Sequence, residues 1–122
     1  MRFATITGTI THTPKIPGNE DGTLTAVIRP ASVRDVDAIS VQLTASVPAE
    51  QMQAELQTAV LRAHVVEVRG LEIDGAFVAD IDTLLEMRDR LPAAAASLFG
   101  DLFVAALGGP SLDPRPSSPR ST

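Results

Sequence analysis

Few residues in this sequence have the type and the spacing to carry out chemistry. The two histidines, His12 and His64, lack the His-x-His or His-x-x-x-His spacing that lets neighbouring imidazoles chelate a metal. Cysteine is absent, which excludes a disulfide framework and a thiolate metal site. We therefore expect both histidines to have ordinary structural roles and the chain to hold no metal.

The conspicuous acidic residues are better explained by turns and helix starts than by ligand binding. The loop Asn19–Gly22 lacks the alternating oxygen donors and the closing glutamate of a calcium-binding loop. Asp80 and Asp82 lie at a predicted helix start, where carboxylates favour the positive end of the helix dipole. No glycine-rich phosphate loop and no Gly-x-Ser-x-Gly nucleophile elbow is present. The sequence predicts no catalytic residue, no cofactor and no enzymatic activity.

Composition limits the remaining classes of function. With 122 residues, the chain has the length of one domain. A formal net charge of −5 argues against binding of nucleic acid, which requires a basic surface. No apolar run approaches the roughly 20 residues that span a bilayer, and the first residues lack the basic start and apolar centre of a signal peptide. We expect a cytoplasmic protein that binds neither nucleic acid nor membrane.

The N-terminal quarter of the sequence predicts an antiparallel β-hairpin. Residues 3–13 alternate with a period of two, with small apolar residues on one face and mainly threonines on the other. Residues 14–22 are rich in turn-forming types, and the alternation resumes over residues 23–29 until Pro30 ends the second strand. An isolated two-stranded hairpin is marginal in water, so another element must pack against it.

Beyond this hairpin the sequence is rich in Ala, Leu and Val and predicts about four helices. Ser32 and Asp35 mark the start of the first helix, as N-cap and first-turn acid. Pro48, Asp80 and Pro92 mark the starts of the other three. The predicted buried stripe of the first helix consists of four residues at helical spacing: Val33, Val36, Ile39 and Leu43.

Two further segments complete the predicted architecture. The Asp74-Gly75 pair is a strong turn signal, and it predicts a second short hairpin within residues 65–79. Residues 110–122 are mainly Pro, Ser and Arg, and this composition predicts a disordered tail. The predicted fold class is α+β, with one domain over residues 1–109 in which the N-terminal hairpin packs on a small bundle of about four helices.

The last helix carries the largest share of the apolar residues. Trp and Tyr are absent and only four Phe are present, so Ala, Val, Leu and Ile must fill the core. We therefore expect modest stability and help from self-association or from a partner. Residues 93–107 are apolar around much of the helix circumference, which is typical either of a central core helix or of an interface. Both interpretations remain open at this point.

The order of these elements resembles that of the tail assembly chaperones of long-tailed bacteriophages. The N-terminal strand pair is followed by IRPASVRDVDAI at residues 28–39, which is similar to the family's strand and capped first helix. The central segment VVEVRGLEIDG at residues 65–75 and the Leu-rich helix, proline and final helix from Asp82 onwards continue the likeness. The resemblance covers about residues 3–107 and concerns the layout of elements.

The resemblance implies a function without catalysis. Such chaperones coat the long hydrophobic tape-measure protein and keep it soluble until tail-tube subunits replace them. An acidic module with a modest apolar face suits reversible cover of an apolar helix. The candidate partner-binding residues all lie on the last helix: Leu98, Phe99, Leu102 and Phe103.

An alternative belongs to a different class of protein. A structural component of a virion or of a secretion machine would use the threonine-rich hairpin to add strands to a neighbouring subunit. This interpretation predicts self-association through residues 2–29, whereas the chaperone interpretation predicts binding of an apolar helix.

Overall fold

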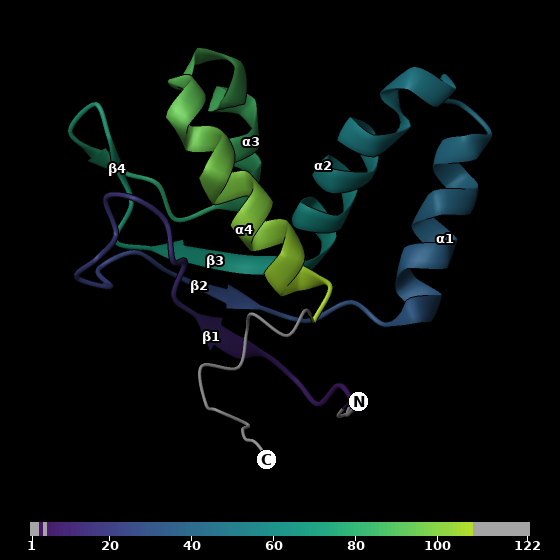
Figure 1. The fold of residues 1–122 in the computed structure, drawn as a ribbon, viewed down its shortest axis with the longest axis horizontal. Coiled ribbons are helices and arrows are strands. Elements are labelled where there is room, and N and C mark those ends of the chain that lie inside the picture. The colour runs from purple at the N-terminus through teal and green to yellow at the C-terminus, as the bar shows by residue number, and fades with distance from the viewer. Residues whose placement is uncertain (1–2, 4, 109–122) are drawn as a thin grey trace.

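The structure is a computed structural model that describes residue 3 and residues 5–108. It has the α+β architecture that the sequence predicts, with an antiparallel sheet and helices stacked against it (Figure 1). The predicted tail, residues 110–122, lies outside the described residues. Within the described part of the chain, no helix has the length and hydropathy that a membrane span requires.

Three antiparallel strands form the main sheet, in the spatial order β1-β2-β3. They are β1 (Ile10–His12), β2 (Thr25–Ile28) and β3 (Val65–Arg69). The N-terminal hairpin supplies the first two strands, as predicted. The third comes from the segment in which the sequence predicted only a separate hairpin, and its addition makes β2 the central strand.

The first strand is much shorter than the alternation over residues 3–13 predicts. Gly8 has a φ of +70°, which bends the chain out of an extended path. Ile10 already pairs with Ile28, the last residue of β2, and Pro30 follows without an N–H to offer. Residues 5–9 therefore have no strand to pair with among the described residues, and the periodic pattern alone could not indicate this.

A buried asparagine organises the loop between β1 and β2. The Asn19 Nδ2 donates to the carbonyl oxygens of Pro14 (2.7 Å) and Leu24 (3.1 Å), while its Oδ1 accepts the Leu24 N–H at 2.9 Å. The Glu20 carboxylate accepts the Gly18 N–H at 3.1 Å. These bonds support the interpretation of this acidic loop as a set of turns.

The predicted second hairpin is present and consists of β4 (Glu72–Ile73) and β5 (Ala76–Phe77). Its turn places Asp74 at φ +54° and Gly75 at φ +83°, the left-handed conformations that Asp and Gly tolerate. The chain then returns alongside β3, where the Val68 N–H donates to the Ala79 carbonyl at 2.9 Å. The outer edge of β3 is therefore partly covered by its own chain.

Four α-helices occur where the sequence predicts them: α1 (Val33–Thr44), α2 (Met52–His64), α3 (Ile81–Met87) and α4 (Ala96–Ala106). Short 3-10 turns at Ala49–Gln51, Arg88–Arg90 and Ala93–Ala95 extend their ends. Ser32 and Asp35 form a reciprocal capping box at the start of α1. Asp80 caps α3 by accepting the Asp82 N–H at 2.9 Å. Local side-chain chemistry thus sets two of the helix starts.

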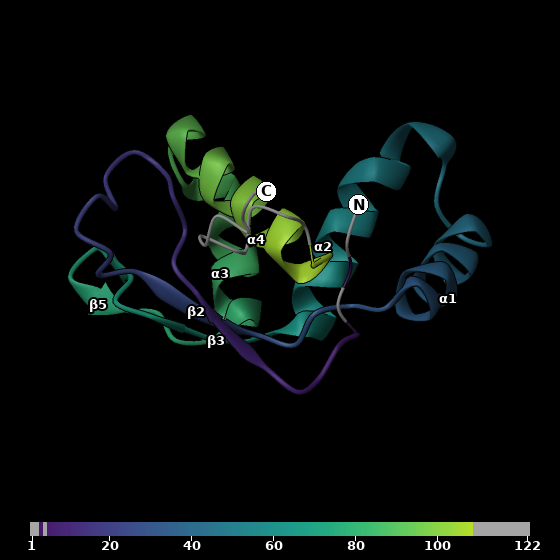
Figure 2. The same ribbon diagram turned by 60° about the horizontal axis from the view of Figure 1, so that its bottom comes forward.

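The hydrophobic core lies between the sheet and the helices α2, α3 and α4 (Figure 2). Ala26, Ile28 and Val68 on the strands are buried against the helices, and Ile10 is partly buried there. The largest of the fully buried side chains across the core include Ile28, Val60, Leu61, Val68, Leu84 and Leu102. The register shift between Val27 and Ile28 leaves Val66 as an extra residue on β3, and its side chain is 50% exposed. The helices therefore cover one face of the sheet.

Helix α1 stands outside this core. It packs mainly against α2, with Ile39 at the edge of the core cluster, and none of its side chains is buried. The prediction of a buried stripe on this helix is wrong at Val33, which is 80% exposed, whereas Val36, Ile39 and Leu43 are only half-buried. The stripe has the spacing of a core helix, but a single neighbouring helix is too little cover to bury it.

Candidate functional site

The structure divides the four predicted partner-binding residues between the core and the surface. Leu98, Phe99 and Leu102 are 5%, 3% and 0% exposed and belong to the core cluster. Phe103 is half-buried at the rim of that cluster. A partner can therefore touch Phe103 directly, whereas the other three side chains are out of reach while the fold is intact.

The Arg88 side chain links this part of α4 to α2. The Arg88 guanidinium lies 5.1 Å from the centroid of the Phe99 ring, within cation–π distance. The same group donates to Thr58 Oγ1 at 3.0 Å and to Gln57 Oε1 at 2.6 Å. A shallow cavity of about 350 Å³ opens beside it, and its lining includes Gln57, Asp89 and Leu91 as well as three alanines. Arg88 therefore has a structural task, and the cavity brings together no nucleophile with a base.

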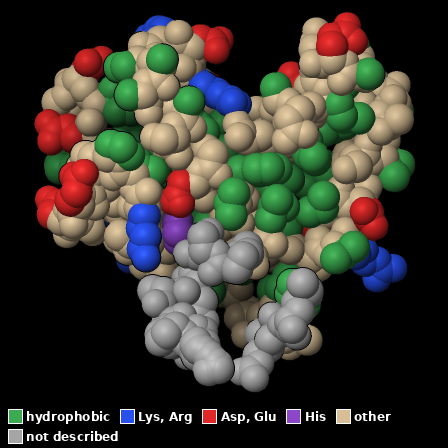
Figure 3. Space-filling model, in the orientation of Figure 1, with side chains coloured by type: hydrophobic (Ala, Val, Ile, Leu, Met, Phe, Trp, Pro, Cys, Tyr) green, Lys and Arg blue, Asp and Glu red, His purple; other side chains and the backbone are tan. Residues whose placement is uncertain are grey.

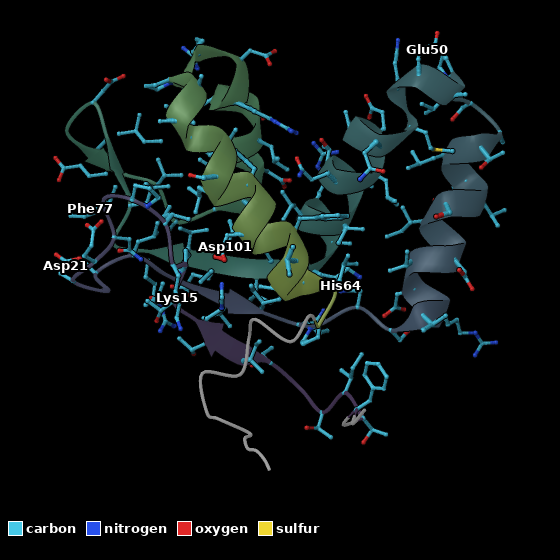
Figure 4. The ribbon with its side chains drawn as sticks, viewed as in Figure 1. Lys15, Asp21, Glu50, His64, Phe77 and Asp101 are labelled. Carbon is cyan, nitrogen blue, oxygen red and sulfur yellow. The ribbon has the colours of Figure 1, made fainter. Side chains whose placement is uncertain are left out.

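Each of the two histidines forms a contact between two segments of the fold. His12 on β1 is 7% exposed, and its Nε2 lies 3.1 Å from Oδ2 of Asp101 on α4. His64, at the end of α2, uses Nδ1 to contact the Arg29 carbonyl at 2.8 Å, and its own carbonyl accepts the Arg29 N–H at 2.8 Å. Figure 4 shows Asp101 and His64 on opposite sides of the end of α4. Their contacts agree with the structural roles that the sequence indicates.

The pairing of His12 with Asp101 is a contact that sequence reasoning missed. The two residues are 89 positions apart, and neither has a neighbour in the sequence that would signal the other. Across residues 5–108 no group of three or more His, Asp and Glu side chains is arranged to hold a metal ion. The pair is thus a link between β1 and α4, and no third group extends it into a reactive site.

The acidic side chains at Asp80 and Glu67 have local partners. The Thr83 hydroxyl and the Asp82 N–H lower the pKa of Asp80, because both donate to its carboxylate. The Arg69 guanidinium lowers the pKa of Glu67 in the same way, with Nε 3.0 Å from Oε2. These carboxylates are ionised and exposed, which suits solvent contact and helix capping.

The most distinctive surface is an apolar face shared by α1, α2 and α4. Figure 3 shows hydrophobic side chains gathered between the lobe that carries α4 and the lobe that carries α1. We define this apolar face by its half-buried and exposed members: Val36, Ile39, Leu43, Leu56, Phe103, Val104 and Leu107. Val104 and Leu107 are 42% and 40% exposed on the last turns of α4.

The cause of this surface is the arrangement of the helices around α2. Helix α1 packs on one side of α2 and α4 on another, and among the described residues no further helix or strand covers the surface between α1 and α4 (Figure 1). Each helix keeps part of its apolar stripe outside the core as a result. Contiguous exposed apolar surface of this kind is typical of a site that binds another protein.

A comparison of the chain with protein-family models, curated proteins and solved structures finds no match in any of the three. A function for this chain is therefore inferred from the apolar face itself. The contribution of α1 to it was missed, because a stripe at helical spacing has the same sequence pattern whether a neighbouring element or a partner covers it. Only the α4 side, at Phe103, was among the predicted contacts.

Proposed function

We propose that this protein is a non-enzymatic assembly chaperone that covers an apolar helix of a partner with its apolar face. The partner proposed here is the hydrophobic helical tape-measure protein of a long-tailed bacteriophage, and the site of action is the host cytoplasm. The choice of partner comes from the resemblance in the order of elements over residues 3–107.

The observation that carries the proposal is the incomplete burial of α1. A 12-residue helix keeps no side chain buried, although Val36, Ile39 and Leu43 form a stripe on one side. A helix laid against this stripe and against Val104 and Leu107 of α4 would remove the remaining apolar area from water. Full burial of one such side chain is worth about 1.5–3 kcal/mol, so several half-exposed ones suffice for reversible binding after the cost of association.

Co-expression with a tape-measure protein tests the proposal. A long helical protein encoded beside this chain is the appropriate partner, and the measurement is the amount of soluble complex recovered. The double variant Val104→Asp/Leu107→Asp places charges on the apolar face at positions that are already exposed. We expect this variant to lose the complex and to leave the partner insoluble.

The matched control places the same charges elsewhere. Val41 and Val66 are 70% and 50% exposed, on the outer side of α1 and on β3. The double variant Val41→Asp/Val66→Asp should keep the complex intact. Equal loss in both variants would mean that the apolar face is not the binding surface, and a partner that is soluble without this chain would remove the need for a chaperone.

A second candidate function has one specific observation in its favour. β1 lies at the edge of the sheet, and no strand within the described residues pairs with its outer side. Phe3 and Ile6, which precede it, are 84% and 44% exposed. A structural subunit would use this edge to add strands to a neighbour. Deletion of residues 1–8 removes Phe3 and Ile6 and keeps β1 and β2. Loss of self-assembly with the fold preserved would favour this function, whereas retained binding of an apolar helix would favour the chaperone.

A further inference from the structure

The apolar face has acidic residues at both of its ends. Helices α1 and α2 run antiparallel, so the start of α1 lies beside the end of α2 and the start of α2 lies at the far tip (Figure 1). Asp35 and Asp37 belong to the start of α1. Glu50 and Glu55 belong to the start of α2 and the turn before it, and Figure 4 shows Glu50 at the tip of this helical pair.

The stretch between these ends carries no charge. No Asp, Glu, Lys or Arg occurs from Ala38 to Ala49, which includes most of α1 and the connection to α2. On α4 the one charged side chain between Ala96 and Ala106 is Asp101, which is turned towards His12 on β1. The face is therefore apolar along its length and charged where the helices begin.

The basic residues of this region offset the acids only in part. Arg62 on α2 is engaged by Asp82, with Nε 3.1 Å from Oδ1. Arg34 lies in the first turn of α1 and reduces the negative charge at that end. No basic residue lies between Val47 and Leu61 in the sequence. The Arg88 guanidinium reaches Gln57 and Thr58 on the second turn of α2, so Glu50, at the tip, lies farther from a compensating charge than Glu55 does. The excess of negative charge is thus larger at the tip.

The carboxylate of Asp35 is held in its ionised form. The Ser32 N–H donates to Oδ2 at 3.0 Å, and this hydrogen bond lowers the pKa of Asp35. Acids in a first turn also complement the helix dipole, which explains their presence at a single helix start. Because α1 and α2 run antiparallel, their two acidic starts lie at opposite ends of the apolar face.

We propose that the occupant of the apolar face is an α-helix with about 12 apolar residues between basic residues at both of its ends. The length follows from α2, whose 13 residues extend about 20 Å at 1.5 Å per residue. This inference rests on the proposed function and specifies the partner's chemistry at the same site. The apolar stretch gives the affinity, and the basic ends fix its register by pairing with Asp35, Asp37, Glu50 and Glu55.

A second copy of the chain is a poorer occupant of this face. Each copy has a formal net charge of −5, so two copies repel one another at long range. The same acids would also meet across a symmetric interface if α1 and α2 packed on their own copies. A basic-ended helix has neither disadvantage.

The test uses the full chain and three synthetic helical peptides. All three share one apolar stretch of about 12 residues, and they differ only in ends made of lysine, of glutamine or of glutamate. Binding is measured by fluorescence anisotropy at low and at high salt. We expect the lysine-ended peptide to bind roughly three- to tenfold more tightly than the glutamate-ended one at low salt, which is the effect of a few exposed ion pairs. High salt should remove the difference.

Charge-reversal variants assign the preference to the face. Glu50→Lys/Glu55→Lys should reverse the preference towards the glutamate-ended peptide. The matched control Glu72→Lys/Asp74→Lys makes the same change of net charge on the β4–β5 hairpin and should leave the preference unchanged. If the control reverses the preference as well, the total charge of the chain is responsible and the proposal is wrong.

The remaining outcomes separate this inference from the proposed function. In one outcome, the three peptides bind equally tightly and lose binding to the Val104→Asp/Leu107→Asp variant. That result would overturn the proposal that the partner helix has basic ends, and it would leave the proposed chaperone function intact. Failure of all three peptides to bind would count against both. A third outcome is that the chain sediments as a dimer and that the same double variant sediments as a monomer. This would show that a second copy covers the apolar face, and it would overturn the proposal.

Discussion

The sheet region and the α1 region of this protein use the same kind of sequence pattern with opposite results. In the sheet region, apolar residues of β2, β3, α2, α3 and α4 meet from several sides, and Ile28, Leu84 and Leu102 have no exposed surface. In the α1 region, an equally regular stripe packs mainly against α2, and every side chain of α1 retains contact with water. An apolar stripe thus predicts which side of a helix is apolar, whereas the burial of that side depends on how many elements pack against it.

Truncation of one leucine in each region should give the largest difference in stability between the two regions. Leu102→Ala leaves a cavity in a site with no exposed surface and should lower the free energy of unfolding by about 2–5 kcal/mol. Leu43→Ala on α1 should lower it by only about 1 kcal/mol, since this side chain is already half in water. Urea unfolding followed by circular dichroism measures both. Equal losses would mean that α1 belongs to the core after all.

A change in the loop of the sheet region should have the next largest effect. Asn19→Ala removes three hydrogen bonds and leaves buried backbone groups of Pro14 and Leu24 without partners. The expected loss is about 1–3 kcal/mol in the free energy of unfolding. Gln53→Ala on the exposed side of α2 is the control and should change stability by less than about 0.5 kcal/mol. A loss as small as that of the control would show that the loop does not depend on this side chain.

The smallest effect is expected at the cap of α1, and it depends on pH. The pKa of Asp35 is lowered in the folded chain by the hydrogen bond from Ser32. Because the folded pKa lies below the unfolded one, the stabilisation is complete above the unfolded pKa and disappears as the pH falls through the folded pKa. Hydrogen-exchange protection factors of α1, corrected for the intrinsic pH dependence of amide exchange, should therefore fall at acidic pH, while those of β2 stay high.

The Asp35→Asn variant provides the control for this prediction. Its amide carries no charge to titrate, so exchange in α1 relative to β2 should lose its dependence on pH between neutral and acidic solution. Persistence of that dependence in the variant would assign it to another group. A parallel fall of the protection factors in α1 and β2 would mean that the two regions unfold together, and the contrast between them would not extend to dynamics.

Local features of the fold were predictable from sequence because their causes lie within a few residues. The Ser32–Asp35 capping box, the Asp80 cap and the Asp74-Gly75 turn each depend on neighbours in the chain. The alternation of the N-terminal quarter correctly predicted a strand pair. It overestimated the first strand, because the pattern contains no information about where the partner strand ends.

Features that depend on distant residues were not predictable in the same way. The addition of β3 to the N-terminal hairpin joins Ala26 to Val68, and the His12–Asp101 link joins the first strand to the last helix. The apolar face also depends on residues that are distant in the sequence. Phe103 was identified from the apolar character of the last helix, while the contribution of α1 emerges only when its single neighbour is known.

The central position of β2 has a consequence for the order in which the chain is made. β2 is synthesised early, but its second neighbour does not exist until translation has passed through α1 and α2 to Val65. During that interval the inner edge of β2, Thr25–Ile28, has unpaired N–H and C=O groups and is open to pairing with other chains. Helices α1 and α2 make local contacts and can form during the interval, whereas the sheet must wait for the closure of a long loop. Slow translation between Ser32 and His64 would prolong the period in which newly made chains aggregate.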